Sequence, residues 1–255
     1  MTLSVSIVSH RHGVYLPALL RRLANVSVRI ERVWLIFDVA EPATLVELER
    51  TPWPFDLRCV VNTQSQSFGR NHNRAFHLEC QSVGHVPHYW WILNPDVEWR
   101  EDPTPSMLAA FSDPTVGLVY PEQVDVVGKP QDHERLIPTP LRVLRRMLAR
   151  LAGVTVETLE QPDWVSGSCV LVRGDVYNRL GGFDERYRLY VEDVEFCLRL
   201  RLAGYILRRA SNACVMHVAQ RRSHRDLQHL SWHLAGFMRL WTSSTFWKYV
   251  GRTFR

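Results

Sequence analysis

The sequence lacks the two phosphate-binding fingerprints that are simplest to find in an α/β protein. The turn after the first apolar segment, SHRHGVYLP, holds a single glycine, and no G-x-G-x-x-G run occurs in the chain. A Walker A sequence is missing as well. Both fingerprints let glycine backbone approach a phosphate closely. A nucleotide, if one binds, must therefore be held by another arrangement of residues.

Long apolar runs are missing too. No stretch reaches the roughly 20 apolar residues that a membrane-spanning helix needs. The first residues, MTLSVSIVSH, contain neither a basic segment nor the small-residue cleavage site of a signal peptide, and they alternate as a strand does. We therefore expect no signal peptide and a cytoplasmic location.

Cysteine is sparse and scattered. The positions are Cys59, Cys80, Cys169, Cys197 and Cys214, an odd number without any C-x-x-C spacing. Zinc sites and redox pairs depend on such spacing, and secreted disulfide frameworks depend on an even count. We expect buried thiols that stay reduced in the cytosol.

Basic side chains are in excess. The chain carries 31 Lys and Arg against 26 Asp and Glu, a formal net charge of +5, and much of the basic charge lies in residues 142–154 and 220–226. Such a surface favours an anionic partner: nucleic acid, a membrane surface or a phosphate-bearing substrate. No zinc-finger spacing or other nucleic-acid motif accompanies the charge, so we expect no nucleic-acid partner.

Strand-like and helical segments alternate through the first hundred of the 255 residues. Strands are expected over residues 3–9, 32–38, 57–62 and 89–93, and helices over 16–26, 41–50 and 70–82. This alternation predicts βαβ units and a mainly parallel sheet, in which ligands bind beyond the carboxyl ends of the strands. The polar residues at those ends are the first site candidates: Asp38, Asn62, Asn94 and Asp96.

The alternation weakens after Asp96. A helix over 103–113, a strand over 116–121 and a surface loop over 128–140 are expected next. Residues 163–183 predict a strand, a helix and a Gly-Gly turn, and residues 214–218 a last short strand. The pattern stops near residue 220, which predicts a main domain over 1–220 and a C-terminal helical segment over 221–255.

Three polar motifs have both a functional and a structural interpretation. The segment NTQSQSFGRNHN, residues 62–73, follows a strand and opens a helix, so it either grips a base or diphosphate or forms a capped loop. Asp96 in LNPDV either holds Mg²⁺ or Mn²⁺ beside a diphosphate or caps a turn. His217 ends an apolar strand, where a lone histidine is more often structural than a metal ligand.

Two adjacent carboxylates, Glu192 and Asp193, stand in an apolar and aromatic segment. Acidic residues favour the first turn of a helix, and buried carboxylates are usually paired, metal-bound or held for proton transfer. Both interpretations hold together if the pair precedes or begins a helix. The inward stripe of that helix would be Val191, Val194, Leu198 and Leu202. Glu195 lies towards this stripe and should pair with a buried partner such as an arginine.

Taken in order, these motifs resemble the inverting, GT-A-fold family 2 glycosyltransferases, particularly their bacterial rhamnosyltransferase-like branch. The matching residues are SIVSH, LIFD, NTQSQSFGRNHNRAF, ILNPDV, the block over 163–205 and VMHV. The resemblance covers roughly residues 3–220. It implies an α/β, Rossmann-like GT-A fold with a donor half over about 1–100 and an acceptor half over about 101–220, followed by C-terminal amphipathic helices.

The resemblance also implies roles for single residues. Those for nucleotide-sugar binding are Ser9, Asp38, Arg70, Asn73, Asn94 and Asp96, with Asp38 at the base. Asp96 and His217 would hold the divalent metal, Mg²⁺ or Mn²⁺. Asp193 would be the catalytic base, and Glu192 beside it would orient the acceptor or exchange roles with Asp193; the sequence does not separate the two. Trp164, Gly167 and Ser168 would line the donor sugar and acceptor. Here the metal motif, Asn94-Pro95-Asp96, keeps one carboxylate, and His10, Arg11 and His12 stand where smaller residues are commoner.

The implied reaction is transfer of a sugar, such as rhamnose, from a UDP- or dTDP-linked donor to a hydroxyl of a saccharide or lipid-linked glycan. Such a reaction would serve bacterial cell-surface polysaccharide assembly. Two alternatives stay open. A nucleotidyltransferase of similar fold would need a Gly-rich basic loop where SHRHGVY stands. A non-catalytic nucleotide-sugar or glycan-binding protein would keep the fold without turnover.

Two amphipathic stretches combine apolar stripes with basic side chains. The first has Leu141, Leu144, Met147, Leu148 and Leu151 beside Arg142, Arg145, Arg146 and Arg150. The second has Leu227, Leu230, Leu234, Phe237 and Trp241. Helices of this kind either lie in a membrane interface or dock onto the core of their own domain. The first alternative would place the protein at the inner face of the cell membrane.

Overall fold

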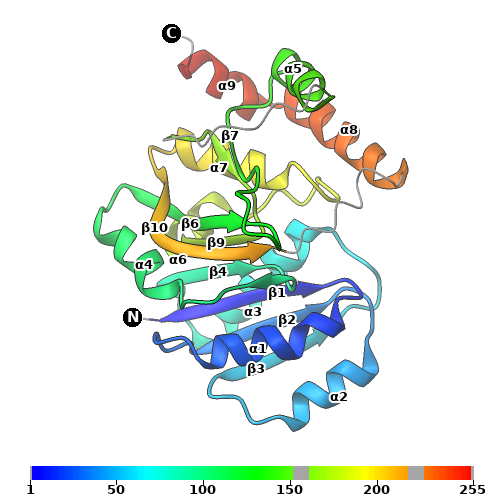
Figure 1. The fold of residues 1–255 in the computed structure, drawn as a ribbon, viewed down its shortest axis with the longest axis vertical. Helices are drawn as coiled ribbons and strands as arrows, with labels where there is room; N and C mark the ends of the chain where they lie inside the picture. The colour runs from blue at the N-terminus through cyan, green and yellow to red at the C-terminus, as the bar shows by residue number, and fades with distance from the viewer. Residues whose placement is uncertain (1, 152–160, 218–226, 254–255) are drawn as a thin grey trace.

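A mixed sheet of eight strands forms the centre of the molecule (Figure 1). The computed structural model describes residues 2–151, 161–217 and 227–253. The sheet order is β3-β2-β1-β4-β9-β6-β10-β5. Its strands are β1 (Leu3–Ser9), β2 (Arg32–Phe37), β3 (Asp56–Val61), β4 (Tyr89–Leu93), β5 (Val97–Glu98), β6 (Val116–Val124), β9 (Cys169–Arg173) and β10 (Ile206–His217). Two short strands, β7 (Glu134–Arg135) and β8 (Trp164–Val165), pair with each other.

The strand directions are mostly parallel. β3, β2, β1 and β4 are parallel neighbours, and β6 is parallel to β10. β9 is antiparallel to both β4 and β6, so β4 and β6 run in the same direction. The predicted α/β class with a mainly parallel sheet is therefore confirmed, with β9 and the short β5 as the antiparallel members.

Helices cover both faces of this sheet. They are α1 (Leu16–Ala24), α2 (Pro42–Arg50), α3 (Phe68–Val83), α4 (Thr104–Ala109), α5 (Pro140–Leu151), α6 (Gly174–Leu180), α7 (Glu192–Leu202), α8 (Leu227–Trp241) and α9 (Ser244–Thr253), with 3₁₀ turns at Gly13–Tyr15 and Ala110–Ser112. α1 and α4 bury Leu20 and Met107 against one face. α3, α6 and α7 bury Phe76, Tyr177 and Leu198 against the other.

The ends of α3 follow from the sequence. The Ser67 hydroxyl accepts a hydrogen bond of 3.2 Å from the Arg70 N–H and caps the first turn. Gly84 ends the helix in the left-handed conformation, with φ of 72°. The predicted helix over 70–82 is thus confirmed and begins two residues earlier, at Phe68. The other predicted helices and strands of the first hundred residues are confirmed within two residues.

The second half differs from the prediction at three places. The single strand expected at the start of residues 163–183 is instead two strands, β8 and β9, which belong to different sheets. The loop expected over 128–140 contains β7. The last strand, expected over 214–218, begins at Ile206 and is 12 residues long. The local sequence does not predict this strand, because it contains the polar residues Arg208, Arg209 and Asn212. Pairing with β6, rather than an alternating apolar pattern, stabilises it.

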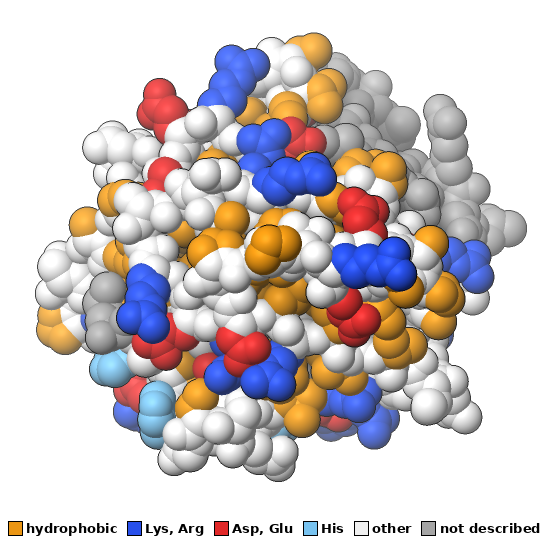
Figure 2. All heavy atoms as spheres, turned by 90° about the horizontal axis from the view of Figure 1, so that it is seen from below, with side chains coloured by type: hydrophobic (Ala, Val, Ile, Leu, Met, Phe, Trp, Pro, Cys, Tyr) orange, Lys and Arg blue, Asp and Glu red, His pale blue; other side chains and the backbone are white. Residues whose placement is uncertain are grey.

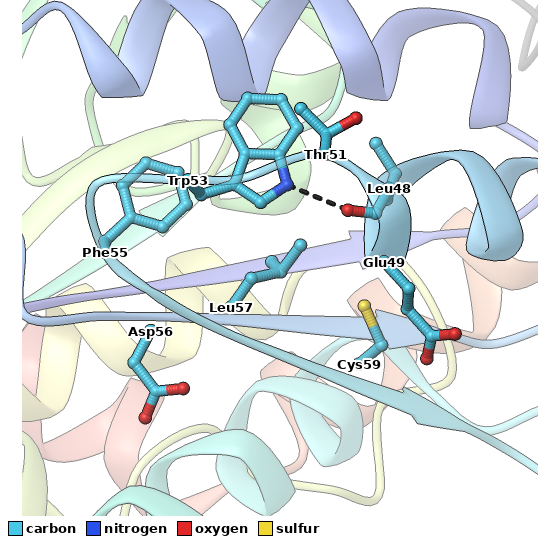
Figure 3. A pocket seen from close by; sticks show the side chains of 8 residues that line it. All are labelled: Leu48, Glu49, Thr51, Trp53, Phe55, Asp56, Leu57 and Cys59. Carbon is cyan, nitrogen blue, oxygen red and sulfur yellow. Dashed lines mark hydrogen bonds between the residues drawn. The ribbon is translucent and has the colours of Figure 1, made fainter.

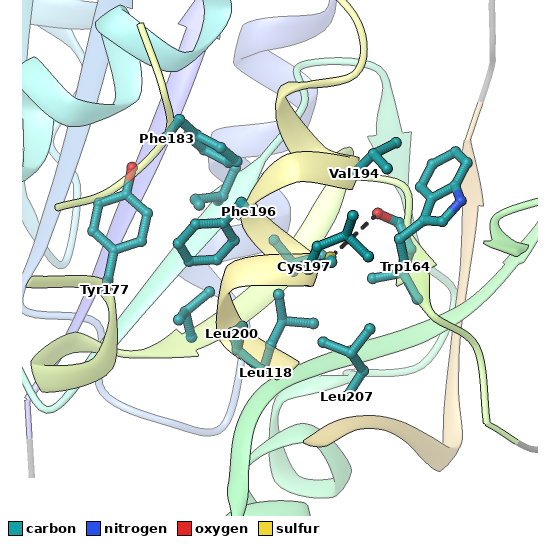
Figure 4. Packing of buried hydrophobic residues seen from close by; sticks show 14 of the residues in the cluster. Leu118, Trp164, Tyr177, Phe183, Val194, Phe196, Cys197, Leu200 and Leu207 are labelled. Carbon is teal, nitrogen blue, oxygen red and sulfur yellow. Dashed lines mark hydrogen bonds between the residues drawn. The ribbon is translucent and has the colours of Figure 1, made fainter. Parts of the chain in front are cut away.

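α7 is clamped in the larger core. Figure 4 shows Phe196, Cys197 and Leu200 of this helix among side chains from β6, β8 and β10. Val191, Val194 and Leu198 of the predicted inward stripe are buried, and Leu202 is half-buried. Glu195 pairs with Arg199 at 2.8 Å, which confirms the predicted arginine partner. The first turn of α7, which carries Glu192 and Asp193, is therefore rigidly placed.

α8 and α9 share this core. Leu240, Phe246 and Tyr249 are buried in it, and the Tyr249 hydroxyl donates a 2.6 Å hydrogen bond to Asp163 Oδ1. The domain boundary predicted near residue 220, and the basic segment over 220–226, lie outside the described residues. Within the described parts of the chain, none of the helices combines the length and apolar character that crossing a bilayer requires.

The two amphipathic stretches are helices, and the structure separates their faces. Leu141, Leu144 and Leu148 of α5 are exposed, so docking onto the core does not account for them. In α8, Leu230 and Leu234 are exposed, whereas Phe237 and Trp241 are half-buried against the core. The side chains of Met147, Leu151 and Leu227 lie outside the described part of the structure.

The cysteines are free thiols, as expected, but not all are buried. Cys169 and Cys197 are buried, Cys59 and Cys80 are half-buried, and Cys214 is exposed. The prediction of a buried thiol is therefore wrong for Cys214. Side chains on either side of Cys214 in β10, those of Ala213 and Val215, are buried, and the alternation of the strand turns Cys214 to solvent.

Candidate active site

The carboxyl ends of β1, β2, β3, β4, β6 and β10 lie along one edge of the sheet, because these strands run in the same direction. Polar residues at these ends are Ser9, Asp38, Asn62, Asn94, Asp96, Gln123 and His217. The first turn of α7 reaches the same edge, since the Gly167 N–H donates to Asp193 Oδ2 at 3.2 Å. The edge thus assembles most of the residues that the sequence singles out.

Asp38 organises the loop that follows β3. Its Oδ1 accepts hydrogen bonds from the side chains of Asn62 and Asn71, each at 3.0 Å, and from the Gln66 N–H at 2.6 Å. Its Oδ2 accepts one from the Ser65 hydroxyl at 2.6 Å. Burial alone would raise the pKa of Asp38, but these donors outweigh it and hold the pKa at about 2. The carboxylate is therefore ionised at any working pH.

The end of β1 is tied to the turn that follows it. The Ser9 hydroxyl donates to Glu41 Oε1 at 2.5 Å, and Glu41 Oε2 accepts the Gly13 N–H at 2.7 Å. The His10 ring nitrogen Nδ1 lies 2.8 Å from Asp38 Oδ2, although the His10 side chain is 56% exposed. A base that contacted Asp38 would have to replace one of these donors, because the Asp38 side chain is only 4% exposed.

Arg70 and Asn73 differ in their access to this edge. Arg70 stands at the N-terminus of α3 with its side chain 60% exposed, 3.6 Å from Glu185. Asn73 is buried, and both ends of its amide are occupied. Its Nδ2 donates to the Phe183 carbonyl at 2.8 Å, and its Oδ1 accepts from the Tyr177 hydroxyl at 2.7 Å. Any effect of Asn73 on a nucleotide would come through the 182–185 turn that it holds.

Gly182 should be the costliest glycine to replace in this turn. Its φ is 66°, and a Cβ there would lie 2.1 Å from Asn73 Oδ1. We expect Gly181→Ala, with φ of 73° and open space around it, to cost about 1–2 kcal/mol from conformation alone. Gly182→Ala should cost about 1–3 kcal/mol more, because Asn73 loses a buried hydrogen bond. Urea unfolding of both variants measures this difference. Equal losses in the free energy of unfolding would contradict the close contact between Gly182 and Asn73.

Glu192 and Asp193 begin α7 after an unusual turn. Tyr190 and Val191 both have φ of 72°, a left-handed conformation that is strained for a β-branched residue. Glu192 is 5% exposed, and its Oε2 has no hydrogen-bond partner among the described residues. Asp193 is half-buried and accepts hydrogen bonds from the N–H groups of Gly167, at 3.2 Å, and Val194, at 2.8 Å.

The two carboxyl groups have different proton affinities. Burial, and then the charge of Asp193, raise the pKa of Glu192 well above its usual range. Burial raises the pKa of Asp193 as well, but the N–H groups of Gly167 and Val194 favour its ionised form. As the pair loses its first proton, the charge therefore resides on Asp193, and Glu192 stays protonated. Asp193 is the member of the pair suited to accept a proton.

Stability should follow the titration of this pair. Folding raises the pKa of such a carboxyl group above its value in the unfolded chain, which is about 4.3 for glutamate. The group therefore destabilises the folded state increasingly as the pH rises above that unfolded-state pKa. Glu192→Gln removes that cost, so its free energy of unfolding should exceed that of the parent protein near pH 8 and match it near pH 4. Chemical unfolding at both pH values measures this. A difference that is larger at pH 4 would contradict the raised pKa of Glu192.

Asp96 and His217 face each other across β5 and β10. Asp96 Oδ1 and His217 Nε2 lie 3.3 Å apart, and each side chain is 13% exposed. A carboxylate oxygen and an imidazole nitrogen at this separation fit a divalent cation whose other ligands are water and a diphosphate. No third His, Cys, Asp or Glu completes a metal cluster within the described residues. The pair alone would hold a cation weakly.

The turn at 166–168 connects the Asp193 carboxylate with the Asn94–Asp96 segment. The Ser168 carbonyl accepts the Asn94 N–H at 2.7 Å, one residue after the Gly167 contact with Asp193. The Ser168 hydroxyl donates to Gln123 Oε1 at 3.0 Å, and Gln123 Nε2 is buried without a partner in the described structure. Trp164, two residues before this turn, is buried, and its indole N–H donates to the Leu136 carbonyl at 3.1 Å. This contact fixes the start of the turn.

Sequence reasoning did not identify Gln123, Glu41 or Asn71. Gln123 is a polar residue at the carboxyl end of β6, so the rule that singled out Asp38 also applies to it. The strand was expected to end at residue 121, two residues too early to reveal it. Glu41 and Asn71 act through contacts 28 to 33 positions apart in the chain, for which the sequence gives no local signal.

A cavity of about 290 Å³ lies elsewhere, between α2 and the beginning of β3. Figure 3 shows the residues that line it, among them Trp53, Phe55 and Cys59. None of the predicted site residues lines this cavity. Burial raises the pKa of the Cys59 thiol to about 11, so this cysteine is not a reactive thiolate.

Sequence comparisons relate this chain to known glycosyltransferases. The profile of the "Glycosyl transferase family group 2" matches residues 143–254. A curated relative, the N-acetylglucosaminyl-diphospho-decaprenol L-rhamnosyltransferase of Mycobacterium tuberculosis, is 30% identical over 240 residues. That alignment covers 85% of this chain and 77% of the mycobacterial protein.

Solved structures share the fold at low sequence identity. A mannosyltransferase from Pyrobaculum calidifontis superposes with a TM-score of 0.62 at 17% identity and covers 93% of this chain; the match spans 64% of that protein, less than two thirds of its length. TarS residues 1–349 from S. aureus superpose with a TM-score of 0.62 at 15% identity, covering 100% of this chain and 73% of that one. The chain thus belongs to glycosyltransferase family 2, enzymes of the GT-A fold, and within it to the rhamnosyltransferase-like branch.

Proposed function

We propose that the protein transfers a hexosyl group, rhamnose in the first instance, from a nucleoside diphosphate sugar to a hydroxyl of a lipid-linked glycan. The observation that carries this proposal is the placement of Asp193. Its carboxylate is held by the Gly167 N–H at the sheet edge, on the turn that also bonds to Asn94. A proton acceptor, a polar loop and a candidate cation pair thus converge where α/β enzymes bind ligands.

The donor would lie along the edge from β3 to β10. The loop organised by Asp38 would face the base, and the exposed Arg70 at the start of α3 offers a cation for the diphosphate. Asp96 and His217 would hold a divalent cation, which supplies neutralisation of the charge on the departing diphosphate. Two solved structures of this fold, the P. calidifontis mannosyltransferase with GDP-Man and Mn²⁺ and TarS with UDP-GlcNAc, carry ligands of these classes.

The proposed reaction is a single displacement. The acceptor oxygen attacks the anomeric carbon, the bond from that carbon to the diphosphate oxygen breaks, and Asp193 takes the proton of the attacking hydroxyl. The anomeric configuration inverts because attack and departure occur on opposite faces of the sugar. Glu192, protonated beside Asp193, would donate a hydrogen bond to the substrate through its carboxyl group, whose Oε2 has no partner among the described residues.

The proposed substrates follow the named relative. The mycobacterial protein is described as acting with rhamnose on N-acetylglucosaminyl-diphospho-decaprenol. An acceptor of that class carries a sugar hydroxyl on a diphosphate-linked polyprenol, which would keep the reaction at a membrane surface. A cytoplasmic enzyme at the inner face of the cell membrane, serving cell-surface polysaccharide assembly, would meet both substrates.

A donor panel tests the proposal. The protein should be incubated with a polyprenyl diphosphate N-acetylglucosamine acceptor and dTDP-rhamnose, UDP-glucose, UDP-N-acetylglucosamine or GDP-mannose in turn. We expect release of the nucleoside diphosphate together with a heavier acceptor in mass spectrometry, and the midpoint of thermal unfolding should rise with the same donor. A thermal shift without transfer from any donor would support the non-catalytic binding protein instead.

A further inference from the structure

An exposed apolar ridge runs along α8. Leu230, Leu234 and Met238, spaced four residues apart, are 48%, 58% and 58% exposed. That spacing places them on one face of the helix. The docked face is marked by Gly236, where a Cβ would lie 2.9 Å from a Val191 methyl group. α8 is therefore fixed to the protein along one side and presents large apolar side chains along another.

Two neighbouring helices carry the same feature. Leu141, Leu144 and Leu148 of α5 are 54–58% exposed, and Trp247 of α9 is 62% exposed. The three helices gather at the top of the molecule in Figure 1. The Trp241 indole at the end of α8 donates to the Pro138 carbonyl, just before α5, at 2.7 Å. Single exposed apolar side chains are ordinary, but a set gathered at one end of a protein marks an interaction surface.

The charge of these helices has one sign. α5, α8 and α9 contain no Asp or Glu in their sequences. Exposed cations on them include Arg145, Arg239 and Lys248. At the other end of the molecule, seen from below in Figure 2, acidic and basic side chains lie interspersed. Cations beside exposed leucine and tryptophan complement a bilayer that carries anionic lipid.

A second copy of the chain fits this surface poorly. A symmetric dimer places the same patch against itself. The cations of α5, α8 and α9 would then face their own copies without an acidic residue on these helices to offset them. An anionic lipid surface satisfies both the apolar and the charged side chains.

The inner side of α8 contacts the turn at Tyr190 and Val191, which leads into Glu192 and Asp193. The Tyr190 hydroxyl lies 2.7 Å from His229 Nδ1, and the Tyr190 ring stacks on His233 with centroids 3.6 Å apart. Tyr190 directly precedes Val191, and both have φ of 72°. The helix that displays the exposed ridge therefore also supports the turn that leads into Glu192 and Asp193.

We propose that α5, α8 and α9 form a docking surface for an anionic membrane, which holds the Asp193 turn close to the bilayer. The lipid binding itself does not depend on the proposed function; its use in presenting a lipid-linked acceptor does. The leucines and the tryptophan insert among the acyl chains near the headgroups, and the arginines and lysine contact lipid phosphates. The surface should accordingly bind vesicles that contain anionic lipid and release them as salt rises.

Vesicle co-sedimentation of the full chain tests this surface. The probes are phosphatidylcholine vesicles with and without about one third phosphatidylglycerol, at low and high salt. Leu144→Glu and Leu234→Glu each place an acid on the surface at an exposed position, and Val46→Glu, on α2 and 44% exposed, is the matched control. We expect tenfold or greater loss of binding to anionic vesicles in the first two variants and parent-like binding in the control.

Three results would overturn the membrane-docking proposal. Parent protein that ignores anionic vesicles at low salt, or Leu→Glu variants that bind as the parent does, would overturn the proposal. A dimer in sedimentation velocity that Leu234→Glu abolishes would assign the ridge to a second copy and overturn it as well. Transfer to a short, water-soluble acceptor should persist in the variants. If the parent protein transfers no sugar from any donor, the proposed function is refuted, and the lipid-binding result is unaffected.

Discussion

Replacing Asp193 by asparagine should lower turnover by about a hundredfold or more while preserving the fold and donor binding. The amide has the size of the carboxylate and still accepts one of the two hydrogen bonds from the Gly167 and Val194 N–H groups. It cannot take a proton from an acceptor hydroxyl. Initial rates at saturating donor, together with the donor-induced shift in unfolding temperature, separate loss of chemistry from loss of binding.

Glu192→Gln is the matched control for this variant. Burial and the neighbouring charge raise the pKa of Glu192, so a neutral amide resembles its protonated form. Turnover should stay within the same order of magnitude as in the parent protein. The opposite pattern, in which Glu192→Gln loses turnover and Asp193→Asn keeps it, would exchange the roles of the two residues.

Asp96→Ala should abolish transfer that depends on Mg²⁺ or Mn²⁺. Asp96 supplies the carboxylate of the proposed cation pair, and His217 lies 3.3 Å from it. A single imidazole would then remain to help hold a hard cation, which prefers oxygen ligands. The parent protein should lose activity in excess chelator and regain it when either cation is restored, whereas Asp96→Ala should stay inactive across a metal titration.

Glu101→Ala is the control for Asp96→Ala. Glu101 is an exposed carboxylate five positions further along the chain and takes no part in the cation pair. Its replacement should leave the metal dependence of the rate unchanged. Full activity of the parent protein in excess chelator would remove the cation from the mechanism and leave charge neutralisation to Arg70 and other cations.

The sequence predicted the elements of the first hundred residues well, because these segments are short and locally marked. α1 has Pro17 in its first turn and repeats leucine at helical spacing, and β4 is the apolar run YWWIL. Polar residues directly after such strands fall at the same sheet edge once the strands are parallel. The sequence alone therefore places Asp38, Asn62 and Asp96 at one edge of the sheet.

The rest could not be predicted because it depends on distant partners. Asp38 is a strand-end acid in the sequence, but the residues that lower its pKa, Gln66 and Ser65, lie 27 to 28 positions away. Asn73 has the composition of a ligand-binding residue, yet the Phe183 backbone, 110 positions later, occupies its amide. β10 owes its length to β6 rather than to its own sequence.

The roles proposed for Glu192 and Asp193 depend on distant contacts in the same way. Glu192 and Asp193 are adjacent and chemically alike, so the sequence left their roles open. The structure distinguishes them by their surroundings: Asp193 receives two N–H donors, and Glu192 is buried with one oxygen unpaired among the described residues. Such differences arise from the meeting of α7 with the 166–168 turn, which no local pattern encodes.

The anomeric configuration of the product tests the central claim most directly. With one nucleoside diphosphate sugar of known configuration, the product linkage can be read from one-bond carbon–hydrogen couplings in NMR. A single displacement with Asp193 as base should give the configuration opposite to that of the donor. A product that retains the donor configuration would contradict the direct displacement and, with it, the role proposed for Asp193.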